Sequence, residues 1–228
     1  MIKNSILILD SVSHFCACAL SDGKKILAQF SENIGKGHVE KLALQVKELC
    51  EENHVSLKDL EKILVNIGPG SFTGIRTSIA FARALALALK KSAFGISQLE
   101  AFAASHKITS HQSDNKILVL LRAYTDFYYV QYFDGNRQAI NVPNLQKIEN
   151  IFSIMKESPK DYTVISNDNQ HLSKMAQEYN LSFFYQEHPL PLDLLRAFYY
   201  QKEHNIAYPL YILEPNAKIP EKINIMQQ

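Results

Sequence analysis

The segment from residue 63 to residue 91 restricts the fold more than any other part of this sequence. Residues 63–67 are an apolar run that predicts a buried strand, and a glycine-rich turn follows, Gly68-Pro69-Gly70-Ser71-Phe72-Thr73-Gly74-Ile75-Arg76. Alanines then alternate with larger residues from 80 to 88, as they would in a strand. Alanine and leucine are nevertheless the strongest helix formers, and the stretch 73–91 is too long for an ordinary strand. We therefore predict a strand, a tight turn and a long helix with small side chains on every face.

The order of the other predicted elements extends this pattern along the chain. Around the turn we predict strands at 6–10, 15–21, 24–31 and 93–96 and helices at 38–53 and 98–107. After a polar linker at 106–115, a similar order of strands and helices is repeated with a less clear pattern. We predict strands at 117–123, 128–133 and 162–166, and helices near 145–156, 172–179 and 192–202. Pro209, Pro215 and Pro220 mark an extended tail. The sequence therefore predicts an α/β protein of two αβ subdomains, residues 1–107 and 108–228, each with its own sheet.

The composition argues against several classes of protein. The 228 residues carry 24 Lys and Arg against 23 Asp and Glu, which gives a net charge of +1. This balance disfavours a dedicated nucleic-acid binder but leaves a weak or shared RNA contact open. Three cysteines without a Cys-x-x-Cys pair indicate neither a disulfide framework nor a zinc site. Since we find no secretory signal and no bilayer-length apolar run, we expect a cytoplasmic protein with no membrane partner.

The glycine-rich turn is the first candidate site. Glycines allow close backbone approach, and the first amides of a helix attract anions, so Gly68, Gly70, Ser71, Thr73, Gly74 and Arg76 are candidates for binding an anion or a partner. Arg76 opposes the helix dipole, which an acidic ligand would explain. The turn is not a Walker A loop, because no Lys-Ser/Thr pair follows its last glycine. The alternative is a turn capped by Ser71 or Thr73, with Arg76 in a structural ion pair.

The carboxyl end of the first strand is the second candidate site. Asp10 and Ser11 lie there, and an aspartate in that place can hold a magnesium-bound phosphate, since ligands gather at the carboxyl ends of strands in open αβ sheets. The alternative is a carboxylate that accepts hydrogen bonds from the amides of the following turn. Both interpretations remain open at this point.

His38 is the third candidate, at the start of the first long helix. A metal-binding pair on a helix needs a second histidine four residues later, and that position is Leu42. The other histidines show no ligand spacing, and a catalytic triad cannot be inferred from spacing alone. We therefore predict no metal ligands and no catalytic residues.

Several of these segments together resemble the TsaB (also called YeaZ) family. The resemblance is carried by Asp10-Ser11, Cys16-Ala17-Cys18-Ala19-Leu20, His38-Val39-Glu40-Lys41-Leu42, the turn at 68–76 and Ser97-Gln98-Leu99-Glu100-Ala101. It is good from residue 6 to about 104, weaker afterwards, and recovers around Tyr208-Pro209-Leu210-Tyr211. The resemblance implies an actin-like, ribonuclease-H-like fold of two αβ subdomains. It also implies a cytoplasmic role in the threonylcarbamoyl modification of adenosine next to the anticodon of certain tRNAs.

The same resemblance implies a set of partners. Members of the family are similar to the catalytic subunit TsaD but have lost its chemistry; they pair with TsaD, and the ATPase TsaE joins them. The implied protein binds no cofactor itself, ATP and a metal ion belong to its partners, and tRNA is reached through the complex. The missing second histidine at Leu42 supports a non-catalytic chain, and so does Arg122-Ala123-Tyr124, which stands where relatives often have Asp-Ala-Arg and thereby lacks a plausible magnesium ligand. Ile67 stands where relatives often have Arg, so any role of the loop in binding an anion rests on Arg76 alone.

The first long helix and the alanine-rich helix are the predicted contact surface. Leu44 lies off the apolar stripe of the first helix, and small residues on the second allow close approach, so His38, Leu42, Leu44, Ala82 and Ala86 are the predicted interface. We expect a homodimer when the chain is alone and a heterodimer with a TsaD-like subunit. The alternative functions are a simple homodimeric module, or an ATP- or metal-dependent hydrolase or kinase of the actin-like superfamily that uses Asp10 and the 68–76 loop.

Overall fold

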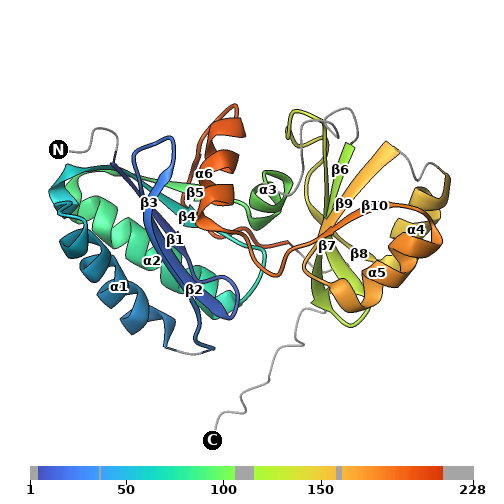
Figure 1. Ribbon diagram of the computed structural model, residues 1–228, viewed down its shortest axis with the longest axis horizontal. Coiled ribbons are helices and arrows are strands. Elements are labelled where there is room, and N and C mark those ends of the chain that lie inside the picture. The colour runs from blue at the N-terminus through green and yellow to red at the C-terminus, as the bar shows by residue number, and fades with distance from the viewer. Residues whose placement is uncertain (1–4, 36, 106–115, 158–160, 213–228) are drawn as a thin grey trace, which may run out of the picture.

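The computed structural model describes residues 5–35, 37–105, 116–157 and 161–212, which form two sheets with helices packed on them (Figure 1). The first sheet contains β1 (Ser5–Asp10), β2 (Phe15–Ser21), β3 (Ile26–Asn33), β4 (Leu60–Asn66), β5 (Ser92–Ile96) and β11 (Asn205–Ile206), in the order β11-β5-β4-β1-β2-β3. The second contains β6 (Lys116–Tyr124), β7 (Phe127–Phe133), β8 (Asn144–Lys147), β9 (Tyr162–Ser166) and β10 (Ser182–Tyr185), in the order β10-β9-β6-β7-β8.

The two sheets share one topology. In each, three antiparallel strands follow one another, and two further strands then add in parallel on the other side of the first strand. Apart from the short β11, both sheets therefore have the strand order of a ribonuclease-H-like fold, present twice as in actin-like proteins. This confirms the predicted fold class of two αβ subdomains.

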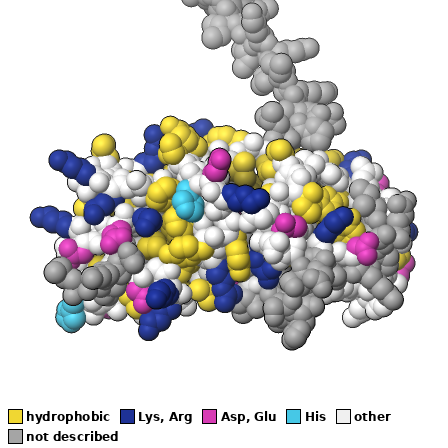
Figure 2. Space-filling model, turned by 90° about the horizontal axis from the view of Figure 1, so that it is seen from above, with side chains coloured by type: hydrophobic (Ala, Val, Ile, Leu, Met, Phe, Trp, Pro, Cys, Tyr) yellow, Lys and Arg dark blue, Asp and Glu magenta, His cyan; other side chains and the backbone are white. Residues whose placement is uncertain are grey.

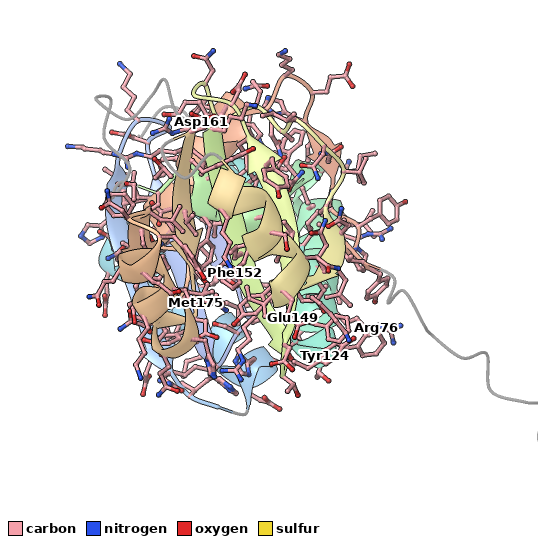
Figure 3. The ribbon with its side chains drawn as sticks, turned by 90° about the vertical axis from the view of Figure 1, so that its right-hand side faces the viewer. Arg76, Tyr124, Glu149, Phe152, Asp161 and Met175 are labelled. Carbon is pink, nitrogen blue, oxygen red and sulfur yellow. The ribbon has the colours of Figure 1, made fainter. Side chains whose placement is uncertain are left out.

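Alternation along the strands distributes the core between the helices. In β1, Leu7 and Leu9 face α1 (His38–Glu52) and α2 (Phe72–Leu89), whereas Ile6 and Ile8 face α6 (Pro191–Tyr200). In β6 the alternation places one set of residues against α3 (Gln98–Ala103) and the other against α4 (Ile148–Glu157) and α5 (Asn169–Glu178). Figure 3 views the second subdomain from its outer end, where α4 carries Phe152 and α5 carries Met175. Helix α3 thus lies between the two sheets.

The sequence predicted the longer elements well and missed the short edge strands. The alanine-rich segment is a helix, as propensity rather than alternation indicated, and the one-turn helix Leu57–Asp59 precedes β4. The predicted helix 145–156 begins instead as β8, because Asn144–Lys147 has a single buried side chain and therefore no clear alternation. Strands β10 and β11 were also missed, being four and two residues long. The predicted linker 106–115 lies outside the described residues.

The end of the chain corrects the predicted division into residues 1–107 and 108–228. Helix α6 packs on α3 and on the first sheet, and β11 pairs antiparallel with β5, so both belong to the first subdomain. Leu194, Leu195 and Phe198 of α6 are buried against Ile6 and Ile8. The chain returns because these residues cover an apolar face of the first sheet that the N-terminal half leaves open.

Helix α2 is the one helix of the described residues that is long and apolar enough, by length and composition, to cross a membrane. Five of its 18 residues are alanine, and Ile75, Ile79 and Ala82 are buried in the core under the first sheet.

Candidate functional site

The predicted site at Asp10, at the carboxyl end of β1, is closed, because hydrogen bonds within the protein occupy its carboxylate. Asp10 ends β1 and Asn66 ends the neighbouring parallel strand β4, and Asn66 Nδ2 donates to Asp10 Oδ2 at 3.0 Å. The amide of Val12 donates to Asp10 Oδ1 at 2.9 Å, and the amide of Gly68 donates to Asn66 Oδ1 at 3.0 Å. Burial raises the pKa of Asp10 to about 6 in spite of these hydrogen bonds. The carboxyl group therefore holds two turns together, as the second interpretation of Asp10 required.

The glycines of the 68–76 turn allow this seal to close. A Cβ on Gly74 would overlap the carbonyl oxygen of Ser11, and a Cβ on Gly70 would overlap Val12. Ser11 Oγ donates to the carbonyl of Gly74 at 2.9 Å, and the amide of Ser71 donates to the carbonyl of Val12 at 2.9 Å. Ser71 also caps α2, since its Oγ accepts from the amide of Gly74 at 3.2 Å. The close approach thus fastens the start of α2 to the turn after β1.

Arg76 points away from this junction. Its guanidinium carbon lies 3.9 Å from the centroid of the Phe72 ring, and its Nε donates to the hydroxyl of Tyr211 at 3.1 Å. The side chain is exposed at the surface (Figure 3). No acidic partner for it is found among the described residues, where its contacts are with Phe72 and Tyr211, so the alternative of a structural ion pair stays without support there.

A cavity of about 850 Å³ lies between the two subdomains. One wall is formed by the turn after β1, by the turn before α1 with the first residues of that helix, by residues 69–74 of the glycine-rich turn and by Gln98. The other wall is formed by the ends of β6 and β9 with Tyr129. Of the predicted site residues, Gly70, Ser71, Thr73, Gly74 and His38 line this cavity. Asp10, Ser11, Gly68 and Arg76 do not belong to its walls.

The second sheet contributes a cluster of polar side chains that sequence reasoning missed. Asp168, which is 5% exposed, accepts from the hydroxyl of Tyr128 at 2.7 Å and lies 3.4 Å from Nη1 of Arg122. His171 Nδ1 lies 3.0 Å from the same carboxylate, and the amide of Arg122 donates to Asn167 Oδ1 at 2.8 Å. Burial pushes the pKa of Asp168 upward, but the hydrogen bonds from Tyr128 and His171 outweigh it and hold that pKa below its ordinary value.

This cluster occupies the same topological position as Asp10 and Asn66. Arg122 lies near the end of β6, and Asn167 and Asp168 follow β9, the parallel neighbour of β6. The available signal was a polar pair directly after the predicted strand 162–166, the same pattern that singled out Asp10 after the first strand. Arg122, noted as a departure from the usual family pattern, is thus paired with a buried acid at the cavity wall.

The predicted interface residues divide into buried and exposed ones. Leu42 and Ala82 are fully buried, and Ala86 is 6% exposed, so these three form core contacts and their prediction as contact residues was wrong. Leu44 is 50% exposed and His38 is half-buried. The misassignment arose because alanine fits either face of α2, and only packing against the first sheet decides which face is inside.

The surface that α1 and α2 expose includes several apolar side chains among charged ones such as Lys47 and Arg83. Val39 and Leu44 project from α1 and Leu87, which is 82% exposed, projects from α2; these three large side chains, together with the exposed Ala43, Ala80, Ala84 and Ala88, are called the outer helical face below. The two helices run side by side over one face of the first sheet (Figure 1). The outer helical face is therefore the part of the predicted surface that is available to a partner.

Comparison with known proteins agrees with the resemblance of the motifs. A family model described as TsaD, tRNA N6-adenosine threonylcarbamoyltransferase, matches residues 25–210. The tRNA threonylcarbamoyladenosine biosynthesis protein TsaB of Buchnera aphidicola subsp. Schizaphis graminum is 32% identical over 182 residues, covering 78% of this chain and 84% of that protein. This chain belongs to the TsaB family. It is related through the matching model to TsaD.

Further TsaB proteins extend the similarity over most of the chain. TsaB of Buchnera aphidicola subsp. Baizongia pistaciae is 25% identical over 224 residues, which covers 92% of this chain and 98% of that protein. Among solved structures, YeaZ from Pseudomonas aeruginosa matches with a TM-score of 0.74 at 22% identity, over 92% of this chain and all of that one. The structural match supports the fold, and the TsaB relatives place the chain among tRNA threonylcarbamoyladenosine biosynthesis proteins.

Proposed function

We propose that this protein is a non-catalytic subunit that supports threonylcarbamoyl modification of the adenosine next to the anticodon of tRNA, and that it does so by forming a heterodimer with a TsaD-like transferase. The observation that carries the proposal is the outer helical face. It presents three large apolar side chains and four alanines, a combination that a partner helix pair can cover closely. A TsaE-like ATPase joins the assembly, which acts in the cytoplasm.

The internal placement of the candidate catalytic groups supports a non-catalytic role. Leu42, at the position where a helical metal pair would need its second histidine, is fully buried in the core. Asp10 is hydrogen-bonded inside the junction of two turns, outside the cavity wall. The alternative hydrolase or kinase that uses Asp10 and the 68–76 loop is therefore disfavoured by geometry.

The surface charge fits a subunit that reaches tRNA through its partner. On the face shown in Figure 2, the described Lys and Arg side chains are interspersed with Asp and Glu and with apolar patches, instead of forming a continuous basic surface. Phosphate recognition usually needs clustered cations. We therefore assign most of the contact with tRNA to the partner subunits of the assembly.

The test is a titration of the cognate TsaD-like transferase with wild-type protein and with three variants, followed by calorimetry and light scattering. Leu44→Glu and Leu87→Glu each place a charge on the outer helical face, and each should weaken the heterodimer at least about tenfold. Val142→Glu is the matched control, because Val142 is 81% exposed on the second subdomain, and it should leave binding unchanged.

Two outcomes would contradict the proposal. One is unchanged binding in both helical variants, and the other is a normal level of the modified nucleoside in cells that lack this protein. The outer helical face also predicts self-association of the isolated chain, which sedimentation should show as a homodimer that the TsaD-like subunit displaces. A homodimer that persists beside excess partner would favour the simple dimeric module.

A further inference from the structure

A smaller cavity, of about 510 Å³, shares no lining residue with the cavity described above. Its walls include Ser97 and Glu100 of the motif at 97–101 and the first three residues of the motif at 208–211. The amide of Leu210 donates to the carbonyl of Ile67 at 2.9 Å, which holds the returning end of the chain beside the first sheet. Two sequence motifs that the scaffold function does not use therefore meet at one cavity.

Glu100 brings to this cavity a carboxylate that has no cation beside it. Its Oε2 accepts from the amide of Ser97 at 2.9 Å and from Nε2 of Gln201 at 2.8 Å. Within the part of the chain that the structure describes, Oε1 has no donor and no Lys, Arg or His forms an ion pair with Glu100. Burial raises the pKa of this carboxyl group, as expected for an acid withdrawn from water without a compensating charge.

Gln131 of β7 adds a second acceptor to the same cavity. The residue is 6% exposed, and its Nε2 donates to the carbonyl of Asn141 at 3.1 Å. Its Oε1 is buried and has no hydrogen-bond partner among the described residues. Buried polar atoms nearly always have a partner, because an unpaired one has lost its hydrogen bonds to water without replacement. A bound molecule with a donor group would supply the missing partner.

The rest of the lining is largely apolar. The side chains that contribute hydrocarbon or aromatic surface are Ile67, Pro143, Ile206, Tyr208, Pro209 and Leu210. Glu100 is the one charged residue among the described residues that line this cavity, so the lining disfavours an anion. One carboxylate and one amide oxygen are too few ligands for a calcium or magnesium ion. The volume lies in the range of small-molecule sites, which are mostly apolar with a few placed polar groups.

We propose that this cavity binds an organic cation, a primary ammonium on an apolar stem, with the ammonium at Glu100 and Gln131 and the stem against residues 206–210. An ammonium has three donors, which suit the free oxygen of the carboxylate and the unpaired oxygen of the amide. This goes beyond the scaffold function and departs from the expectation that the chain binds no cofactor. No lining residue belongs to the outer helical face, so amine binding and heterodimer formation can be tested separately.

The experiment is an NMR titration of the ¹⁵N-labelled full chain with hexylammonium, compared with hexanol and hexanoate, which carry an uncharged and a negative head group on the same stem. We expect hexylammonium to bind at least about tenfold more tightly than hexanol, and hexanoate to bind more weakly than hexanol. Glu100→Gln should remove the preference for hexylammonium and leave the affinity for hexanol unchanged. Glu149→Gln, at an exposed glutamate of α4 outside the cavity, is the matched control and should change none of these affinities.

The ammonium could be delivered by a free amine or by a lysine side chain of a partner protein, and one further pair of probes separates these sources. Butylammonium and Nα-acetyl-lysine methylamide carry the ammonium on the same four-carbon stem, the second on a peptide backbone. Tighter binding of the lysine derivative supports a lysine of a partner, and tighter binding of butylammonium supports a free amine.

Three results would overturn the proposal. They are the absence of shifts at the cavity residues with millimolar hexylammonium, binding of hexanol as tight as that of hexylammonium, and an unchanged affinity for hexylammonium in folded Glu100→Gln protein. Thermal unfolding of each variant establishes folding. If Glu100→Gln is unfolded, Gln131→Met takes its place, since it removes the second acceptor and should weaken the binding of hexylammonium but not of hexanol.

Discussion

Strands β1 and β4 of the first sheet occupy the same positions in the repeated topology as β6 and β9 of the second. The aspartates at the carboxyl ends of these strands nevertheless have different partners, and their pKa values are shifted in opposite directions. In the first sheet, Asp10 faces Asn66 inside a sealed junction and its pKa is raised. In the second, Asp168 faces Arg122 and Tyr128 beside the cavity, and its pKa is lowered. The difference shows that topology selects where polar side chains gather, whereas local packing decides whether they connect two turns or border a cavity.

The close contact between the turn after β1 and the start of α2 depends on Gly74. Replacing Gly74 by alanine should destabilise the protein by about 3 kcal/mol or more, because the added Cβ overlaps the carbonyl oxygen of Ser11 and the turns must separate. Urea denaturation measures the effect. Ala84→Ser, on the exposed side of the same helix, is the control and should change stability by less than about 1 kcal/mol. A Gly74→Ala protein of wild-type stability would show that the junction is not closely packed.

The two aspartates should give pH dependences of opposite sign. Asp10 has a pKa of about 6 in the folded protein against 3.8 ordinarily, so the folded state binds its proton more tightly. Its contribution to stability should therefore fall by about 2 kcal/mol as the pH rises from 4 to 6. Asp168, whose pKa is lowered, contributes stability that is present above its ordinary pKa of 3.8 and is lost as the pH falls below it.

Denaturation from pH 3 to pH 7, in the wild type and in Asp10→Asn and Asp168→Asn, checks both signs. Other groups titrate in all three proteins, so the informative quantity is the difference in unfolding free energy between the wild type and each variant. For Asp10→Asn this difference should move against the wild type between pH 4 and pH 6. If it is independent of pH there, the carboxyl of Asp10 is not desolvated in the way its burial indicates.

Two tyrosines of β7 test how much the hydrogen bond to Asp168 contributes to stability, and this is the smallest of the predicted effects. The hydroxyl of Tyr128 donates to the buried Asp168 at 2.7 Å, so Tyr128→Phe should cost about 1–2 kcal/mol in urea denaturation. The hydroxyl of Tyr132 is buried and has no hydrogen-bond partner among the described residues, so Tyr132→Phe should be neutral or slightly stabilising. Equal losses in the two variants would mean that the hydrogen bond to Asp168 contributes nothing specific.

The longer elements, the αβ fold class and the family could all be predicted from the amino-acid sequence. The alanine-rich segment of α2 was assigned correctly because helix propensity is a local property, and the resemblance rested on residues 6–104 that lie mostly in contiguous motifs. The sequence offered Ser71 or Thr73 as the cap of α2 for the same reason, since a helix cap acts within one turn of chain, and the structure shows Ser71 in that role.

The contacts between distant residues and the buried faces of the helices, in contrast, could be seen only in the folded protein. Ser11 and Gly74 lie 63 residues apart in the sequence, and Tyr128 and Asp168 lie 40 apart, so no local sequence pattern predicts either contact. The sequence likewise did not show which face of α2 is buried, because alanine is tolerated on either face. Packing against the first sheet buries Ala82 and leaves Ala84 exposed. Periodicity and propensity act within a few residues, whereas burial and hydrogen-bond pairing depend on segments that come together only when the chain folds.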